Sequence, residues 1–268
     1  KELSLEISLE SSQNGIHLVE LCEMSGREFK DLQNRLRSYY FKVFKPAFTG
    51  LSNAEKEFVI NLYSNDVLDK NEIKTVYSSL YAYLYGQAEN HILNKDEWKD
   101  YLQAYRESKI SNKDNLYLQQ YYKSERSNST SLYNMYYAIP RQETVVESYV
   151  VDSDIYVLDG VGAEYLPLLV ELLKRNGYDT EFCDYAACHL PSITDVNREY
   201  LSNIPYVEWF LDFDRNVIHG EFYKTSVNLR KAFDILEKKI KEITMDSAGK
   251  RIVITADHGA TARARWTD

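Results

Sequence analysis

The chain has 268 residues, with 32 Lys and Arg against 41 Asp and Glu, and a formal net charge of −9. This acidic balance argues against a dedicated binder of nucleic acid or of anionic membranes, because both need a basic surface. No run of about 18 apolar residues occurs, which argues against a transmembrane helix. The first residues, KELSLEISLE, lack a basic-then-apolar signal pattern, and the three Cys form no CxxC pair. We therefore expect a cytoplasmic protein without disulfides.

Helical periodicity dominates the first 145 residues. Apolar side chains recur there at steps of three and four, which is the spacing of one helical face. Sixteen of the 23 Tyr also lie before residue 151. We expect a mainly α-helical, Tyr-rich N-terminal domain over residues 1–147, with helices over 26–48, 51–63, 72–93 and 95–110.

The pattern changes after about residue 145. Short β-branched runs now alternate with amphipathic helical stretches, which is typical of an open α/β sheet. We expect strands over 155–158 and 180–188 and in the β-branched run of KRIVITADHG at 250–259, and helices over 163–178 and 221–243. These elements predict an α/β domain over residues 148–268, with a mostly parallel sheet flanked by helices.

Acidic residues follow two of the predicted strands. Asp159 directly follows the first predicted strand, and Asp257 and His258 follow the last one. The carboxyl ends of parallel strands lie at one edge of a sheet, where binding sites form. An Asp-Gly turn is an alternative explanation for each segment. Two carboxylates at one edge repel each other, however, and a cation between them removes that repulsion.

Carboxylate and imidazole side chains are suitable ligands for a divalent metal ion. We therefore predict a metal site made by Asp159, Asp257 and His258. A bound cation lowers the pKa of a nearby hydroxyl, and Thr194 in the segment HLPSITDVN is the candidate for that hydroxyl. A Ser/Thr-rich loop without catalytic function is the alternative for this segment.

Three of these segments together resemble a PglZ domain, a branch of the alkaline phosphatase superfamily. The matching pieces are LDGVG at 158–162, PSIT at 191–194 and TADHGAT at 255–261. The resemblance covers residues 151–268. It implies an alkaline-phosphatase-like α/β domain. The superfamily has a further His downstream of the Asp-His pair, so the resemblance implies either that the domain is incomplete at its C-terminus here or that a second metal ion is incompletely held.

The resemblance also implies roles for single residues. Thr194 is implied as the nucleophile and as a metal contact, and Asn197 as a donor to a phosphate oxygen. The superfamily holds two divalent ions, usually zinc, with manganese as the alternative here. For the second ion the resemblance points to His219 and Asp214, although the superfamily pattern has Asp where His219 stands. Arg263 is expected to bind phosphate, with a solvated strand face as the alternative.

By this resemblance, the function is that of a metal-dependent phosphatase or phosphodiesterase. PglZ proteins belong to BREX and phage-growth-limitation defence systems, so the expected partners are a phosphoester substrate and other defence proteins, such as a methyltransferase or an ATPase. Nucleic acid is expected only through a partner, and no membrane is expected. One alternative is a PglZ scaffold with weak or no catalysis, which assembles other proteins. A metal-dependent nuclease is a third possibility.

Overall fold

The structure is a computed structural model that describes residues 53–88, 95–111, 115–123, 131–205, 207–220 and 226–259. The helix predicted over 26–48 lies outside these residues. None of the described helices combines the length and the apolar character needed to cross a membrane.

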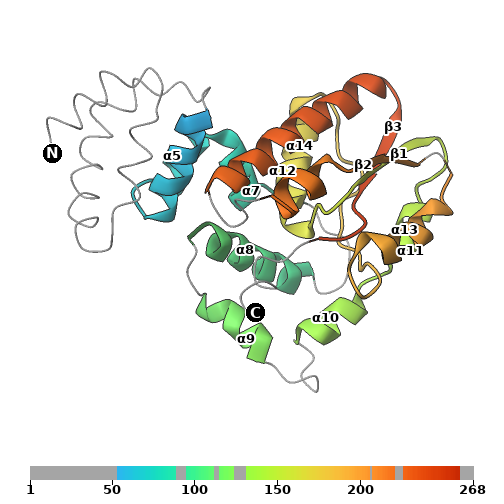
Figure 1. Cartoon of the computed structure of the whole chain (residues 1–268), viewed down its shortest axis with the longest axis horizontal. Coiled ribbons are helices and arrows are strands. Elements are labelled where there is room, and N and C mark those ends of the chain that lie inside the picture. The colour runs from blue at the N-terminus through green and yellow to red at the C-terminus, as the bar shows by residue number, and fades with distance from the viewer. Residues whose placement is uncertain are drawn as a thin grey trace, which may run out of the picture.

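The described chain before residue 147 is helical, as its periodicity predicts (Figure 1). A capping box at Asp69 begins the second helix of this part, because its side chain accepts hydrogen bonds from two amides of the first turn and Glu72 bonds back to its amide. The helices are α5 (Asn53–Ser64), α6 (Lys70–Val76), α7 (Ser78–Tyr85), α8 (Lys95–Ser111), α9 (Leu116–Lys123), α10 (Leu132–Ala138) and α11 (Gln142–Glu147).

Strands and helices alternate in the described chain after residue 150. Gly177, with a φ of 84°, follows the C-cap of the first long helix in this part, a position that favours glycine. The elements are β1 (Ser153–Leu158), a 3₁₀ turn (Ala163–Tyr165), α12 (Leu166–Arg175), α13 (Thr194–Ser202), β2 (Val207–Phe210), a π-helical turn (Asp214–Ile218), α14 (Ser226–Asp246) and β3 (Arg251–Thr255).

A parallel three-stranded sheet lies between two helical layers. Its strand order is β2-β1-β3, so β1 is central. Alternate side chains of β1 point to opposite faces: Tyr156 and Leu158 join the core formed with α12 and α14, whereas Ile155 and Val157 pack with α11 and α13. Figure 1 shows the two helical layers on either side of the strands. A parallel sheet covered on both faces is the α/β arrangement that the sequence predicts.

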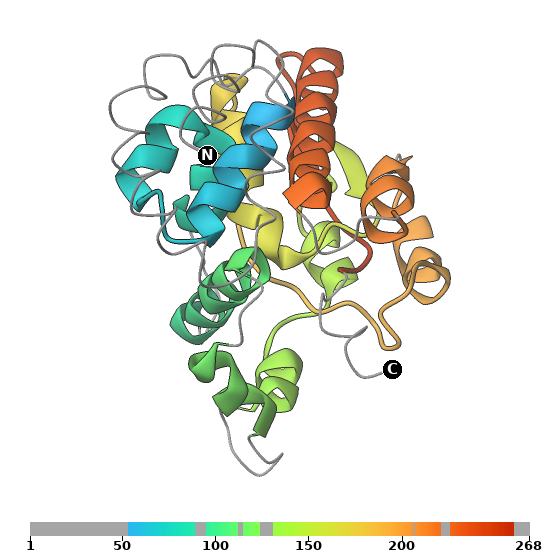
Figure 2. The ribbon, with the colours of Figure 1, turned by 60° about the vertical axis from the view of Figure 1, so that its left-hand side comes forward.

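Helices from both parts of the chain share one hydrophobic core. Phe58 of α5 and Leu80 and Tyr83 of α7 belong to the same buried cluster as Leu168 of α12 and Phe233 of α14. The ring centroids of Tyr83 and Phe233 lie 5.2 Å apart. Figure 2 shows α5 beside the long helix α14. The boundary between two domains at residues 147 and 148 stays a prediction, since the described helices on both sides of it pack together.

The helical stretch predicted over 72–93 is divided into two helices in its described part, residues 72–88, and residues 89–93 lie outside the described residues. The chain leaves helical geometry at Tyr77, whose φ and ψ are −146° and 82°, so that α6 ends and α7 begins there. The buried ring of Tyr77 packs edge-on against Phe233, with 5.9 Å between ring centroids. Periodicity continues across the break, and for this reason the sequence pattern does not reveal it.

The strand predicted over 180–188 is also absent from the sheet. Only Ala187 makes a strand-like contact, an isolated parallel bridge to Arg141. The third strand is instead β2, four residues with the sequence VEWF that the sequence analysis does not identify. Its pattern of one exposed and three half-buried residues is too short to give a periodic signal.

A buried ion pair links α8 to the turn that precedes α12. Lys109 Nζ lies 2.7 Å from Glu164 Oε1, and the Tyr83 hydroxyl donates to the other oxygen of Glu164 at 3.3 Å. The two charged side chains are only 12% and 5% exposed. Burial alone lowers the pKa of Lys109, but the Glu164 carboxylate and the neighbouring Tyr residues raise it well above its ordinary value. Lys109 is therefore charged and compensates the buried carboxylate.

Lys109→Met should reduce the free energy of unfolding by about 3 kcal/mol, because it leaves a buried carboxylate without its cation. Adding Glu164→Gln should restore part of this loss. Urea unfolding of the single and double variants measures both effects. Lys250→Met, which breaks an exposed pair with Asp154, is the control and should change stability little. An equal loss in Lys109→Met and Lys250→Met would contradict this account of the pair.

Candidate metal and nucleophile site

Two carboxylates lie side by side at one edge of the sheet. Asp159 directly follows β1, and Asp257 lies two residues beyond the end of β3. Because β1 and β3 are neighbouring parallel strands, their carboxyl ends meet at this edge. Asp159 is 4% exposed and Asp257 is fully buried. The structure thus brings together the two strand-end carboxylates that the sequence singles out.

His258 and Thr194 complete the group. His258 Nε2 lies 3.5 Å from Asp159 Oδ1 and 3.5 Å from Asp257 Oδ2. Thr194 is the first residue of α13, and its hydroxyl donates to Asp159 Oδ1 at 3.1 Å and lies 2.9 Å from His258 Nε2. One ligand atom from each of Asp159, Asp257 and His258 can be chosen so that all lie within 4.8 Å of one another. Residues from three segments that are far apart in sequence therefore form one compact polar site.

The electrostatics of this site are unfavourable without a cation. Burial, and next the neighbouring Asp257 carboxylate, raise the pKa of Asp159 to about 6. Asp257 Oδ1 accepts a hydrogen bond from the Gly160 amide at 3.1 Å. Asp257 Oδ2 is buried and receives no hydrogen bond. A buried carboxylate oxygen without a donor costs free energy, and a metal ion bound there removes that cost. The donor set and its unpartnered oxygen both fit a divalent cation.

Two glycines allow the metal-site loops to approach closely. A Cβ atom on Gly259 would lie 2.6 Å from the Cα of Gly162, a distance that real Cβ atoms essentially never show. Gly162 belongs to the loop after Asp159, and Gly259 directly follows His258. The glycine of the Asp-His-Gly segment therefore lets the two strand-end loops touch.

Asn197 holds the loop that carries Thr194. Its side chain is buried, its Oδ1 accepts from the His189 amide at 2.6 Å, and its Nδ2 donates to the carbonyls of His189 and Ile193 at 3.2 and 3.1 Å. Both side-chain donors and the acceptor are thus used by backbone groups. Asn197 is therefore buried against the loop backbone. Because its polar atoms already bond to backbone groups, this geometry does not support the predicted bond to phosphate.

His189 anchors the same loop, and the sequence does not predict this role. Its ring stacks on Tyr200 with 3.6 Å between centroids, and its Nε2 lies 2.8 Å from Glu143 Oε1. Glu143 belongs to α11, 46 residues earlier. No local pattern links residues so far apart, so this contact carries no sequence signal.

The residues predicted to bind a second metal ion, Asp214 and His219, form a pair next to Gly160. His219 Nε2 is 3.4 Å from Asp214 Oδ2, and the His219 side chain is 67% exposed. A Cβ atom on Gly160 would lie 3.0 Å from Asp214 Oδ1, and the Asp214 charge contributes to the raised pKa of Asp159. Asp214 and His219 thus form a pair beside the main site, but among the described residues they do not join the three-ligand cluster.

The predicted phosphate ligand Arg263 lies outside the described residues. No protein-family model, curated protein or solved structure matches this chain.

Asp159→Asn should stabilise the metal-free protein at pH 7. The folded-state pKa of Asp159 lies above its ordinary value of 3.8, so the ionised carboxylate is destabilising. The penalty is absent below about pH 4 and complete above about pH 6, where it reaches at most about 3 kcal/mol. Urea unfolding in chelator at pH 4 and pH 7 measures it.

Asp154→Asn on the same strand is the control, because hydrogen bonds from Lys250 and Ser247 lower the pKa of Asp154. This substitution should not stabilise the protein at pH 7. If Asp159→Asn destabilised the metal-free protein at pH 7, the proposed repulsion between Asp159 and Asp257 would be refuted.

Gly259→Ala should weaken zinc binding at least tenfold, because the new methyl group separates the loops that carry the ligands. Calorimetric titration of the metal-free protein measures the affinity. Gly249→Ala is the control: Gly249 has a φ of 78° with open space around it, so this substitution strains a turn without moving the ligands. Equal affinities in Gly259→Ala and the unchanged protein would contradict the close approach.

Proposed function

We propose that the chain is a metal-dependent phosphoester hydrolase, a phosphatase or phosphodiesterase, with Thr194 as nucleophile. The observation that carries this proposal is the contact of one hydroxyl with both a carboxylate and an imidazole of the ligand cluster. The α/β sheet with its site at the carboxyl edge is compatible with an alkaline-phosphatase-like domain. The resemblance of residues 151–268 to a PglZ domain supports the same assignment.

Asp159, Asp257 and His258 are the residues that would hold a divalent cation. Two oxygen ligands and one nitrogen ligand suit zinc and also manganese. When bound, such a cation offsets the negative charge of phosphoryl oxygens and lowers the pKa of a neighbouring hydroxyl. The resemblance implies two ions, and for a second one Asp214 and His219 are the candidate ligands.

In this proposal Thr194 attacks phosphorus. Its oxygen would form a bond to phosphorus while the bond from phosphorus to the leaving oxygen breaks, which gives a phosphothreonine and an alcohol. Asp159 Oδ1 already accepts the hydrogen bond of this hydroxyl and is therefore placed to take its proton. A water oxygen then bonds to phosphorus while the bond from phosphorus to the Thr194 oxygen breaks. Phosphate, or a phosphomonoester from a diester, is released, and the Thr194 oxygen regains the proton held by Asp159.

The N-terminus of α13 would bind the phosphoryl oxygens. Thr194 is the first helical residue, and the N-cap residue, Ile193, makes no side-chain hydrogen bond to the amides of the first turn. Free amides and the helix dipole make such an end a site for anions. Asn197 and His189 fix the loop ahead of this turn, so the nucleophile and the amides are held together.

The biological setting follows from the resemblance. We propose a role in a BREX-type defence system, with a methyltransferase or an ATPase as partner. The runner-up function is a PglZ scaffold with weak or absent catalysis. The separation of Asp214 and His219 from the main cluster is the observation that favours it.

Thr194→Ala should lower the zinc-dependent release of p-nitrophenol from p-nitrophenyl phosphate or bis(p-nitrophenyl) phosphate at least 100-fold, because the nucleophile is lost. Thr194→Ser should keep measurable activity. Ser192→Ala removes an exposed hydroxyl two residues away and is the matched control, with no expected change. An unchanged rate in Thr194→Ala would refute the assigned nucleophile, and no zinc-dependent rate in any variant would favour the scaffold.

A further inference from the structure

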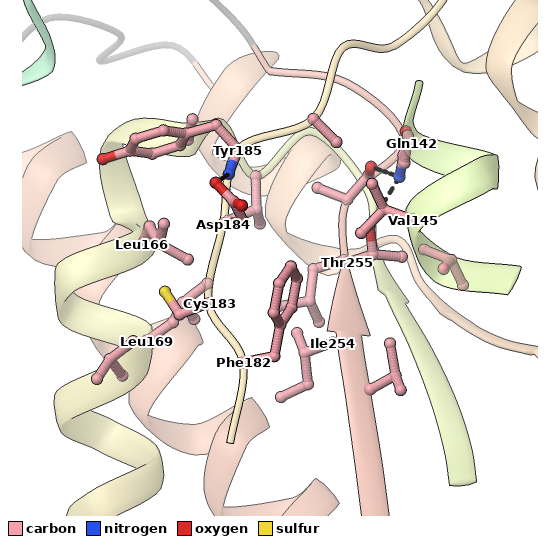
Figure 3. A pocket seen from close by; sticks show the side chains of 18 of the residues that line it. Gln142, Val145, Leu166, Leu169, Phe182, Cys183, Asp184, Tyr185, Ile254 and Thr255 are labelled. Carbon is pink, nitrogen blue, oxygen red and sulfur yellow. Dashed lines mark hydrogen bonds between the residues drawn. The ribbon is translucent and has the colours of Figure 1, made fainter. Parts of the chain in front are cut away.

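An elongated cavity extends along the outer edge of β3. Its volume is about 560 Å³, which lies in the range of small-molecule sites. β1 occupies the other edge of β3, and the coil of residues 178–186, α11 and α12 form the remaining walls. Figure 3 shows the side chains of Phe182 and Ile254 in the space between the coil and β3. The segment that the sequence predicts as a strand thus forms a wall of this cavity instead of pairing with β3.

The middle of the cavity is apolar. Leu166 and Leu169 of α12, Val145 of α11, and Phe182 and Ile254 line it (Figure 3). Apolar cavities exclude water and bind apolar molecules of matching size. Burying the apolar surface of a ligand here is therefore favourable.

Three polar side chains on the cavity wall, Gln142, Lys250 and Arg251, already have partners. The Gln142 amide donates to Thr255 Oγ1 at 2.8 Å and also to the Ala256 carbonyl. At the amino end of β3, Arg251 Nη2 lies 3.0 Å from Glu181 Oε2, and Lys250 Nζ lies 2.9 Å from Asp154 Oδ2.

The charge on this wall disfavours an anionic ligand. Both cations that line the described cavity are neutralised by carboxylates, and Asp179 and Asp184 add negative charge. A neutral apolar group suits this cavity better than a nucleotide or a polyphosphate.

One end of the cavity reaches the candidate metal site. Asp257, His258 and Gly259 line it, whereas Thr194 and Asp159 do not. Thr194 contacts His258 and approaches the site from outside the cavity. In an in-line displacement the leaving group departs on the side opposite the nucleophile, so a cavity that Thr194 does not line is suited to receive it.

We propose that the cavity binds an extended, neutral and apolar leaving group, so that the preferred substrates are phosphoesters of long-chain alcohols. This inference rests on the proposed function of the same site. In this proposal the cavity binds the alcohol part of the substrate, and the residues Asp159, Asp257 and His258 bind the phosphoryl part through a metal ion.

The test compares ethyl phosphate with octyl phosphate, or their methyl diesters if only diesters are cleaved. Both leaving groups are primary alcohols of similar basicity, so they differ mainly in apolar surface. Burial of one methylene corresponds to about 0.8 kcal/mol, or about fourfold in affinity. With zinc present, kcat/KM should be at least tenfold higher for the octyl ester, mainly through KM. 1-Octanol should bind the metal-free protein in calorimetry, which tests the cavity without catalysis.

Val145→Phe places a larger side chain in the cavity, and should lower both octanol affinity and the octyl-to-ethyl ratio of kcat/KM at least fivefold. Thr144→Phe adds the same ring to the exposed face of α11, outside the cavity, and should leave both quantities unchanged. These two variants separate the effect of filling the cavity from the effect of adding an aromatic residue to α11.

Hydrolysis of both esters without a preference, no octanol binding, or equal effects of the two Phe substitutions would overturn the cavity assignment and leave the proposed hydrolase standing. Octanol binding without hydrolysis of any ester would refute the proposed hydrolase, and the leaving-group assignment with it.

Discussion

The repulsion between two buried carboxylates at the ends of β1 and β3 is the constraint on which the site depends. Parallel pairing of these strands places Asp159 and Asp257 at one edge, and burial removes the water that would screen them. The result is a raised pKa for Asp159 and an oxygen of Asp257 without a hydrogen-bond donor. Such an arrangement is unfavourable for a purely structural site, and it fits a site that binds a cation.

The rest of the fold keeps these groups in position. The two helical layers cover both faces of the sheet, so the strand ends cannot move apart without exposing apolar core. The α13 loop brings Thr194 to the edge, and Asn197 and His189 fix that loop through backbone and side-chain contacts. Gly162 and Gly259 then let the two strand-end loops touch. The nucleophile and the ligands are thus held by contacts between segments that are distant in sequence.

The sequence predicts that Asp159, Asp257 and His258 lie together, and it can do so because its signals are local. A β-branched run that ends in an acidic residue indicates both a strand and the position of its carboxyl end, and this places Asp159 and Asp257 together. Thr194 follows from the resemblance, and the structure brings its hydroxyl to the same group.

The features that the sequence does not predict depend on tertiary packing. The break at Tyr77 comes with packing of its ring against α14, and residues 180–186 line a cavity although their composition suits a strand. The four residues of β2 are too short to show a period. The use of Asn197 as a loop anchor depends on His189 and Ile193 backbone groups, whose positions no sequence pattern gives.

Zinc content after dialysis tests the central claim most directly, with Asp257→Asn compared to the unchanged protein. The substitution keeps the shape of the side chain and removes the charge whose oxygen lacks a donor. The account predicts at least one zinc per chain in the unchanged protein, and a loss of most of it in Asp257→Asn with the circular dichroism spectrum preserved. No zinc in the unchanged protein, or equal zinc in both, would contradict it.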